Sequence, residues 1–237
     1  LEEWAKKIDV KHTVILGGEP LLHPDIIQWI YGIRRLFPNY SGVQVQTNGT
    51  RLDCVKGLYE ALQPEEGNWL GVSIHNPLDQ EDIFQKIRDF LKPPIVETHD
   101  STHWMGSDHQ FVDHNNVYIH AWDSHEFINN NIIEINETQR TLYQSDPVVA
   151  HDLCAFRRFK NYHMIQGKIY KCGPVGLMPE FDQQYPFDIS DADRELLYSY
   201  QPLTVDNYDT IGEQWLANID NVIPQCKFCP ETYTKKP

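Results

Sequence analysis

Short apolar runs and segments with helical apolar spacing alternate along the first part of the chain. Runs rich in β-branched and apolar residues are typical of strands buried on both faces, and they cover residues 13–16, 42–46 and 69–75. Each run is followed by apolar residues three or four positions apart, which predicts helices over residues 24–37, 52–62 and 83–91. Three consecutive strand–helix units with short connections favour parallel strands joined by right-handed crossovers, in an α/β layer or barrel fold.

This rhythm weakens beyond residue 93. Two further strands are predicted at residues 95–98 and 117–121, with a polar loop between them. From about residue 145 the rhythm is lost, and four of the five cysteines lie in this proline-rich part. We therefore expect two domains, residues 1–144 and 145–237. The second would have little core of its own, and a ligated metal centre would compensate for that.

The turns after the predicted strands carry the candidate binding chemistry, because ligands of α/β folds bind at the carboxyl ends of the strands. The first turn, residues 17–20, reads Gly-Gly-Glu-Pro. Its glycines let a ligand approach the backbone closely, and its glutamate offers a carboxylate to a cation such as an ammonium group. It lacks the Gly-Lys-Ser of a phosphate loop. The alternative interpretation is a tight strand–helix connection without a ligand.

Four cysteines form the strongest metal-binding signal. Cys226 and Cys229 make a Cys-x2-Cys pair whose sulfurs can face one metal, and Cys154 and Cys172 bracket Gly167 as Cys-x12-Gly-x4-Cys. A short strand after the glycine turn is predicted to end at Cys172. Four thiolates suit either tetrahedral zinc or a cubane iron–sulfur cluster, so the spacing leaves both open.

Composition and charge narrow the remaining classes. The 237 residues carry a net charge of −14, which disfavours a nucleic-acid partner, and the basic run at residues 157–160 is too short to outweigh it. No apolar run approaches the roughly 20 residues of a membrane span, and no signal segment opens the chain. We expect a cytoplasmic protein without a membrane partner. In that reducing compartment, clustered cysteines indicate metal ligation or catalysis.

Two further features are less specific. Six of the eleven histidines lie in residues 99–125, with tryptophans such as Trp122 nearby. We expect an exposed loop that forms a substrate-facing rim, and a metal site with His99 and His103 is the weaker alternative. Cys54 stands alone inside a predicted helix and is expected to be structural.

Together these motifs resemble the radical SAM superfamily, specifically members with a C-terminal SPASM or twitch domain. The Gly-Gly-Glu-Pro turn looks like the family motif that holds the amino group of the methionine moiety. Residues 46–50, Gln-Thr-Asn-Gly-Thr, resemble the turn after the third barrel strand, and residues 71–75 resemble the fourth strand. The Cys-x12-Gly-x4-Cys segment and the late Cys-x2-Cys pair are similar to the accessory-cluster signature. The resemblance spans nearly the whole chain.

The resemblance implies an α/β fold with a partial (β/α)6 barrel over residues 1–144 and a small loop-rich iron–sulfur domain over residues 145–237. The residues implied to bind S-adenosylmethionine are Gly17, Gly18, Glu19, Pro20, Thr47, Asn48 and Ser73. The ligands implied for an accessory [4Fe–4S] cluster are Cys154, Cys172, Cys226 and Cys229. Such enzymes cleave S-adenosylmethionine to a 5′-deoxyadenosyl radical that abstracts hydrogen from a substrate. Here the implied partners are a small-molecule or peptide substrate and an electron-donor protein.

One family motif is missing. The Cys-x3-Cys-x2-Cys motif that ligates the primary [4Fe–4S] cluster precedes the Gly-Gly-Glu-Pro turn in the family, and no cysteine stands before Gly17 here. We expect an upstream segment to supply it, the primary cluster to occur only in an extended form, and this chain alone to be inactive. No cysteine follows Cys229, which resembles a twitch domain with one cluster.

Two rival interpretations stay open. One is a zinc-stabilised, non-catalytic barrel protein with a binding role. The other is a non-radical α/β enzyme whose glycine–glutamate turn binds a different cationic ligand.

Overall fold

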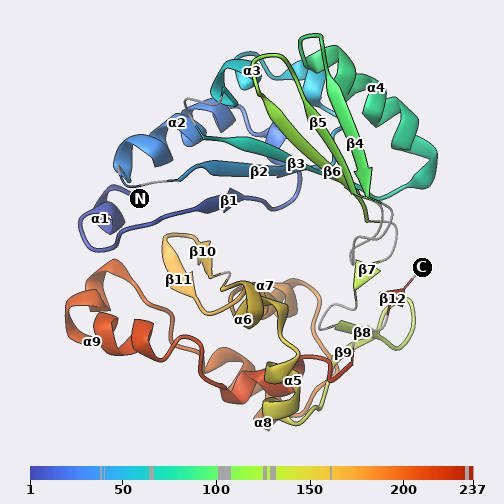
Figure 1. Ribbon diagram of the computed structural model, residues 1–237. Coiled ribbons are helices and arrows are strands. Elements are labelled where there is room, and N and C mark those ends of the chain that lie inside the picture. Colours follow the sequence, from blue (N-terminus) through green and yellow to red (C-terminus); the bar gives the residue numbers. More distant parts are fainter. Residues whose placement is uncertain are drawn as a thin grey trace. The chain divides into compact units, whose positions relative to one another are not determined.

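The computed structural model describes the chain except for residues 38, 40, 64–66, 101–107, 125–126, 129–131, 161, 233–234 and 237. It contains two compact units, Leu1–Glu126 and Phe127–Pro237, whose elements are labelled in Figure 1. Residues 127–144 lie in the second unit. The domain boundary that the loss of the strand–helix rhythm predicts between residues 144 and 145 stays a prediction.

The first unit is built on a six-stranded mixed sheet. The strand order is β1 (Thr13–Ile15), β2 (Val43–Thr47), β3 (Trp69–Ile74), β6 (Tyr118–Asp123), β5 (Asp108–Val112) and β4 (Val96–Asp100). The first four strands in this order pair in parallel, and β5 and β4 are antiparallel additions. The predicted α/β class is confirmed. A barrel is not shown, because β1 and β4 form the two edges of the sheet in the described part of the chain.

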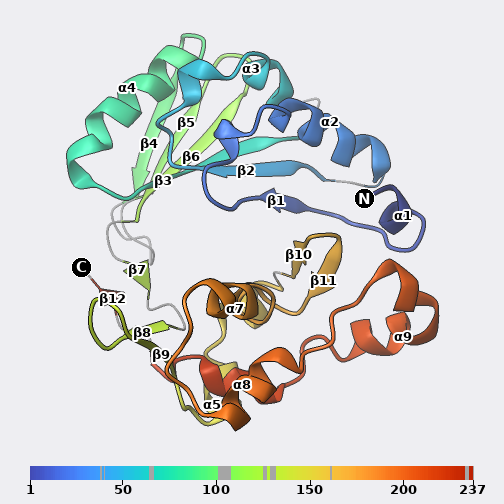
Figure 2. The same cartoon turned by 180° about the vertical axis from the view of Figure 1, so that it is seen from behind.

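Helices cover one face of this sheet. The helices of the unit are α1 (Glu2–Ala5), α2 (Ile26–Leu36), α3 (Leu58–Ala61) and α4 (Gln80–Phe90). Figures 1 and 2 show α2, α3 and α4 on the same side. Apolar side chains of the strands, such as Val45 and Val72, are fully buried there against Ile30 and Ile87 of the helices. Burying such side chains is the main favourable term in folding, so this layer holds the unit together.

Two predicted elements of the first unit differ from the structure. The single helix expected over residues 52–62 is divided into a 3₁₀ turn at Leu52–Cys54 and the short helix α3. Gly57 lies between them with φ of 82°, a left-handed conformation that interrupts a helix. Consequently Cys54 is exposed rather than buried inside a helix. The polar loop expected before residue 117 contains strand β5.

The second unit combines helices with small hairpins. Its strands are β7 (Phe127–Ile128), β8 (Ile132–Glu134), β9 (Arg140–Leu142), β10 (His163–Ile165), β11 (Lys168–Tyr170) and β12 (Lys235–Lys236). Its helices are α5 (Pro147–Asp152), α6 (Ala155–Phe159), α7 (Gly173–Gln184), α8 (Asp191–Tyr198) and α9 (Val205–Ala217), and a 3₁₀ helix, η5, spans Pro224–Phe228. The unit is therefore more helical than the loop-rich domain that was predicted.

A small core and an ion pair with a buried carboxylate organise this second unit. The buried apolar side chains that pack together are Leu142, Met178, Phe187, Leu197 and Phe228. Beside them Asp182, only 3% exposed, pairs with Arg194 and accepts hydrogen bonds from the Phe187 N–H and the Tyr198 hydroxyl. Burial alone would raise the pKa of Asp182, but these donors outweigh it and lower the pKa.

The predicted strand before Cys172 is confirmed. Strands β10 and β11 form an antiparallel hairpin whose two turn residues, Gln166 and Gly167, have φ of 48° and 76°. Two successive positive φ angles are typical of the turn that matches the twist of a hairpin. The strand ends at Tyr170, and Cys172 follows as the residue that caps the start of α7.

No helix in the described ranges is both long enough and apolar enough to cross a membrane.

Candidate functional site

The Gly-Gly-Glu-Pro turn and the turn after β2 are joined by one carboxylate. Oε1 of Glu19 accepts hydrogen bonds from the Leu21 N–H at 2.9 Å and from the Thr47 hydroxyl at 2.6 Å. Its Oε2 accepts from the Asn48 N–H at 2.8 Å. The structure therefore brings together the two turns that the sequence singled out, at the carboxyl ends of neighbouring parallel strands. It also gives Glu19 a role the sequence did not reveal, which is to fix the two turns to each other.

The two glycines keep the front of this turn open. Gly17 and Gly18 are exposed, with φ of 109° and 54°, and a Cβ added to either would meet nothing within 4 Å. They are required for their backbone conformation rather than for lack of space. Behind them Pro20 is buried at the start of a 3₁₀ turn, Pro20–Leu22, which Glu19 caps. The exposed backbone beside a carboxylate suits the ammonium group of a small ligand.

The turn after β2 is rigidly organised. The hydroxyl of Thr47, which is 3% exposed, accepts a hydrogen bond from the Gly49 N–H at 3.1 Å while it donates to Glu19. The side-chain oxygen of Asn48 accepts from the N–H and the hydroxyl of Thr50. Such local bonds fix a turn, because they replace backbone partners that the turn lacks.

Ser73 lies on the face of the sheet opposite to the helices. It is 8% exposed and its hydroxyl accepts a hydrogen bond from the Gln46 side chain, which in turn accepts from Gln44. Gly71, two residues before it, leaves the space for this chain. A Cβ there would lie 2.8 Å from the Gln44 amide nitrogen and 2.9 Å from the Trp122 ring.

Besides Ser73 and Trp122, the same face carries polar residues that the sequence did not reveal. We call it the polar face, and it comprises Gln44, Gln46, Ser73, Asp108, Gln110, His120 and Trp122, which the strand register aligns across β2, β3, β6 and β5. Its most notable pair is His120 and Asp108, whose imidazole and carboxylate are in contact. Three aromatic rings surround His120, with centroids 5.0–6.3 Å away: Trp69, Tyr118 and Trp122. Burial, and secondarily Asp108, raises the pKa of Tyr118.

The histidine-rich segment is only partly an exposed loop. His99 and His109 are register partners on β4 and β5, and their rings stack with centroids 4.3 Å apart. Burial first, and repulsion from His99 second, lower the pKa of His109. His103 and His125 lie outside the described residues, so the alternative metal site with His99 and His103 stays a prediction. Trp122 belongs to the polar face.

All four C-terminal cysteines line one small cavity in the second unit. Cys154 follows α5, Cys172 caps α7, Cys226 lies in η5 and Cys229 comes directly after it. Cys172 and Cys226 are 7% and 8% exposed, and the other two are half-buried. The cavity has a volume of about 20 Å³. The residues at its wall also include His151 and Lys171.

The chemistry of this donor set fits a metal centre, although the thiols are not arranged around a metal as they stand. Among the described residues, no three His, Cys, Asp or Glu side chains are placed so that they could hold a metal ion together. Burial raises the pKa of the Cys172 thiol to about 12, and the nearby Cys154 and Cys226 add to this. Burial likewise raises the pKa of Cys226, so the two buried thiols are neutral without a cation, whereas a bound metal would be ligated by thiolates.

A buried ammonium group stands beside these thiols. Lys171 is 6% exposed, and its Nζ donates to the carbonyls of Ile219 at 2.5 Å and Asn221 at 2.6 Å rather than to a carboxylate. Burial lowers the pKa of Lys171, whereas Cys226 and Cys172 act to raise it. Their effect on the pKa reflects how close the ammonium group lies to the two sulfurs. A fixed positive charge favours thiolates, so Lys171 supports an anionic centre in this cavity.

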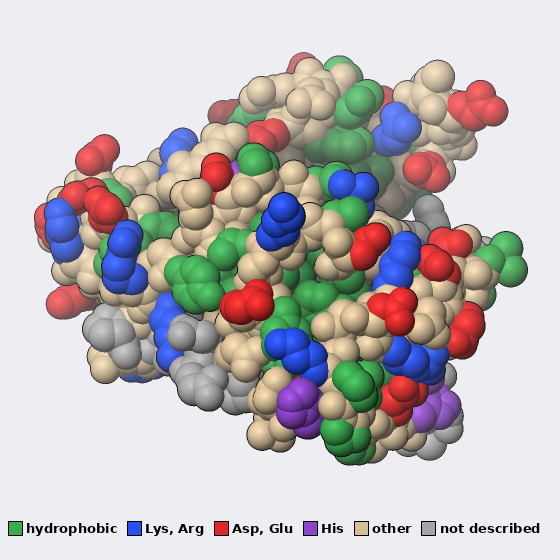
Figure 3. Space-filling view, turned by 90° about the horizontal axis from the view of Figure 1, so that it is seen from above, with side chains coloured by type: hydrophobic (Ala, Val, Ile, Leu, Met, Phe, Trp, Pro, Cys, Tyr) green, Lys and Arg blue, Asp and Glu red, His purple; other side chains and the backbone are tan. Residues whose placement is uncertain are grey.

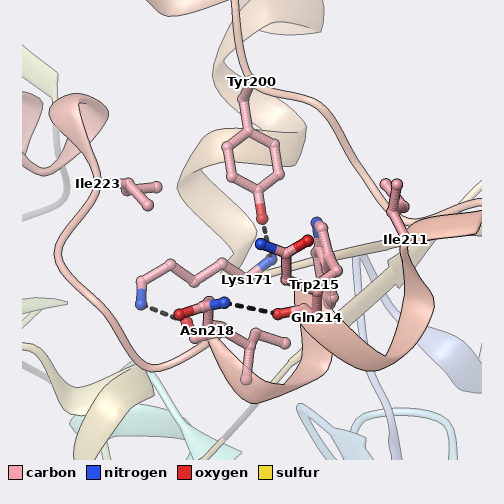
Figure 4. A pocket seen from close by; sticks show the side chains of 8 residues that line it. Lys171, Tyr200, Ile211, Gln214, Trp215, Asn218 and Ile223 are labelled. Atoms are coloured by element: carbon pink, nitrogen blue, oxygen red, sulfur yellow. Dashed lines mark hydrogen bonds between the residues drawn. The ribbon is translucent and has the colours of Figure 1, made fainter.

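A second cavity of about 320 Å³ lies on the other side of Lys171 (Figure 4). Tyr200 points into it from above, where its hydroxyl accepts a hydrogen bond from the Lys171 N–H. The wall from α9 and the loop after it is mostly apolar, and it is formed by Ile211, Gln214, Trp215, Asn218 and Ile219, with Ile223 completing it. Lys171 and Ile223 belong to both cavities, so a ligand here would lie next to the cysteines.

Charge does not gather into one patch on the face of the molecule seen in Figure 3. Acidic and basic side chains are interspersed there among apolar ones. The expectation that no nucleic acid is bound rests on the net charge and stays a prediction.

Comparison with known proteins gives one positive result. A family model described as the Radical SAM superfamily matches residues 1–99. This stretch contains all the residues predicted to bind S-adenosylmethionine, and it ends before the cysteine cavity. The first part of the chain is therefore similar to the radical SAM superfamily, whose members in general use a [4Fe–4S] cluster and S-adenosylmethionine. No curated protein and no solved structure matches the chain.

Proposed function

We propose that the chain is the S-adenosylmethionine-binding and accessory-cluster part of a radical SAM enzyme. The observation that carries the proposal is the Glu19 carboxylate, which unites the Gly-Gly-Glu-Pro turn with Thr47 and Asn48 at the carboxyl ends of β1 and β2. In this role the backbone of residues 17–18 and the remaining lone pairs of Glu19 bind the amino group of the methionine moiety. Thr47, Asn48 and Ser73 line the pocket of the cofactor, in a partial (β/α)6 barrel.

The polar face is the natural side for the substrate. Its aromatic rings and the His120–Asp108 pair combine apolar contact with groups that can hold or move a proton. We propose that a peptide or small molecule is bound there.

In the family, the primary cluster supplies the electron that releases the 5′-deoxyadenosyl radical, which abstracts hydrogen from the substrate. These 237 residues contain no Cys-x3-Cys-x2-Cys motif, so we propose that they do not perform this cleavage by themselves.

The cysteine cavity is proposed to hold an accessory [4Fe–4S] cluster that relays electrons, in a twitch-like domain of a cytoplasmic enzyme. Four thiols around one cavity and the buried Lys171 beside them support this proposal. An electron-donor protein would be its partner.

A zinc-stabilised binding protein is the second candidate. The observation in its favour is the size of the cysteine cavity, which at about 20 Å³ has room for roughly one water-sized sphere. Anaerobic purification separates the candidates. Brown protein with iron and sulfide supports the cluster, whereas colourless protein with one zinc supports the alternative.

The cofactor site is tested by titration of S-adenosylmethionine into the full chain, followed by calorimetry. We expect binding that Glu19→Ala weakens at least about tenfold, because one charge-assisted hydrogen bond contributes roughly 1.5–3 kcal/mol. Glu60→Ala is the matched control, since Glu60 is exposed on α3. Equal affinity of both variants would contradict the proposed role of Glu19.

A second assay measures 5′-deoxyadenosine under reducing conditions. We expect none from these 237 residues and formation from a form extended upstream to include a Cys-x3-Cys-x2-Cys motif. Product from the 237-residue chain would refute the proposed inactivity.

A further inference from the structure

His151 is a fifth potential ligand at the cysteine cavity. It lies in α5, whose first turn is fixed by Asp146, the side chain of which accepts hydrogen bonds from the N–H groups of Val148 and Val149. The imidazole is 4% exposed and lines the same cavity as the four cysteines. Its Nε2 is fully buried and has no hydrogen-bond partner.

The other ring nitrogen determines what Nε2 can do. The imidazole has a hydrogen bond to the backbone of Asp220. This bond raises the pKa of His151, which is the effect of a carbonyl group that accepts a proton from the ring. Since Nε2 has no partner, this bond belongs to Nδ1, which therefore carries the proton. In the neutral ring Nε2 then has a free lone pair, on a side chain that lines the cavity. Metal-ligating histidines commonly have this arrangement, with one nitrogen on the metal and the other donating to a carbonyl.

A purely structural histidine explains this geometry less well. A buried polar atom without a partner is unfavourable and therefore rare in folded proteins. An apolar side chain would fill the same position without that cost. A metal ion in the cavity gives Nε2 the partner that it lacks.

We propose that His151 ligates the metal centre through Nε2, together with three of the four cysteines. A zinc ion or a cubane cluster takes four protein ligands, so five donors leave one to spare. Cys172 and Cys226 are the buried pair, and the spare ligand is one of the half-buried residues Cys154 and Cys229. This inference rests on the metal centre of the proposed function, but not on whether that centre contains zinc or iron.

The test uses Zn²⁺ alone, added to the full chain after bound metal has been removed under anaerobic, reducing conditions. X-ray absorption distinguishes a nitrogen at about 2.0–2.1 Å from sulfurs at about 2.3 Å. We expect three sulfurs and one nitrogen for the wild type. His151→Ala should lose the nitrogen and bind Zn²⁺ at least about tenfold more weakly, whereas His151→Cys should restore the affinity with four sulfurs.

His163→Ala is the matched control, because His163 is a half-buried histidine of the same unit that does not line the cavity. It should leave the ligand set and the affinity unchanged. Circular dichroism of the metal-free variants checks that α5 and its neighbours have folded, and the His151→Cys variant provides the test if His151→Ala does not fold.

Four sulfurs in the wild type and no effect of His151→Ala would overturn the ligand role of His151 while leaving the cysteine centre intact. A wild-type chain that binds no Zn²⁺ in the cavity would overturn both the ligand role of His151 and the proposed metal centre, and it would leave the proposed S-adenosylmethionine site untouched.

Discussion

The two units of this chain reach a folded state in different ways. In the first, a sheet and three helices bury a continuous apolar layer that extends from Leu21 to Ala121. In the described part of the second, the largest buried side chains gather in a small cluster around Phe228, accompanied by the ion pair of Asp182 and by the cysteine cavity. The first unit therefore depends on the amount of apolar surface that it buries, whereas the second depends more on a few polar groups and thiols in specific positions.

The largest expected effect is the loss of the proposed metal centre. We expect the double variant Cys172→Ser, Cys226→Ser to lose bound metal and hydrogen-exchange protection in residues 127–237, while residues 1–126 keep theirs. Structural zinc contributes about 10–16 kcal/mol to the folding of small domains. We therefore expect the loss of protection to be confined to the second unit. Cys54→Ser, at an exposed cysteine of the first unit, is the control. Equal loss of protection in both units would show that they do not fold separately.

Next in size is the ion pair between the buried Asp182 and the half-buried Arg194. Asp182→Asn should lower the free energy of unfolding of the second unit by about 1.5–3 kcal/mol, because it removes a charge-assisted hydrogen bond to Arg194. Glu180→Gln, exposed on the same helix, is the control and should change little.

The same pair makes a prediction about pH. The pKa of Asp182 is lowered in the folded state, so its contribution is complete above the unfolded value of about 3.9 and is lost as the pH falls further. Urea unfolding measured from pH 6 to pH 2.5 should show a smaller loss for Asp182→Asn than for the wild type. Parallel curves for the two proteins would contradict this assignment.

The smallest effect tests the polar face of the first unit. Gly71→Ala should lower stability by about 1–3 kcal/mol, because its Cβ would overlap the Gln44 amide and the Trp122 ring. Gly32→Ala in α2 meets nothing within 4 Å, and it should raise stability by roughly 0.5–1 kcal/mol. Thermal unfolding of the two variants compares them directly. A neutral Gly71→Ala would mean that this face tolerates repacking.

The first unit was also the easier one to predict. Strands β1, β2 and β3 and helices α2 and α4 follow the apolar pattern, since a parallel strand covered by helices leaves a continuous apolar run. The pattern failed at β5, whose sequence Asp-His-Gln-Phe-Val is mostly polar because alternate residues belong to the polar face. It also failed at Gly57, where the apolar spacing continues across a left-handed residue that breaks the helix.

The candidate site was predictable where the order of the strands determines which residues lie close together. The turns with Glu19 and Thr47 follow neighbouring parallel strands, so their meeting follows from the topology. His120 and Asp108 come together through an antiparallel strand that the sequence did not indicate. His151 carries only one signal, a spacing of three residues from Cys154, which is too common to single out a ligand.

The β10–β11 hairpin has a consequence for how this chain can change in length. Two left-handed residues fix the turn, and β11 leads directly to Cys172. An inserted residue before β10 would only lengthen a connection, whereas one between Gly167 and Cys172 would shift β11 by one position and exchange its two faces. Cys172 would then be turned away from the other cysteines. The number of residues between Gly167 and Cys172 is therefore fixed by the fold, whereas the number of residues between Cys154 and Gly167 can vary.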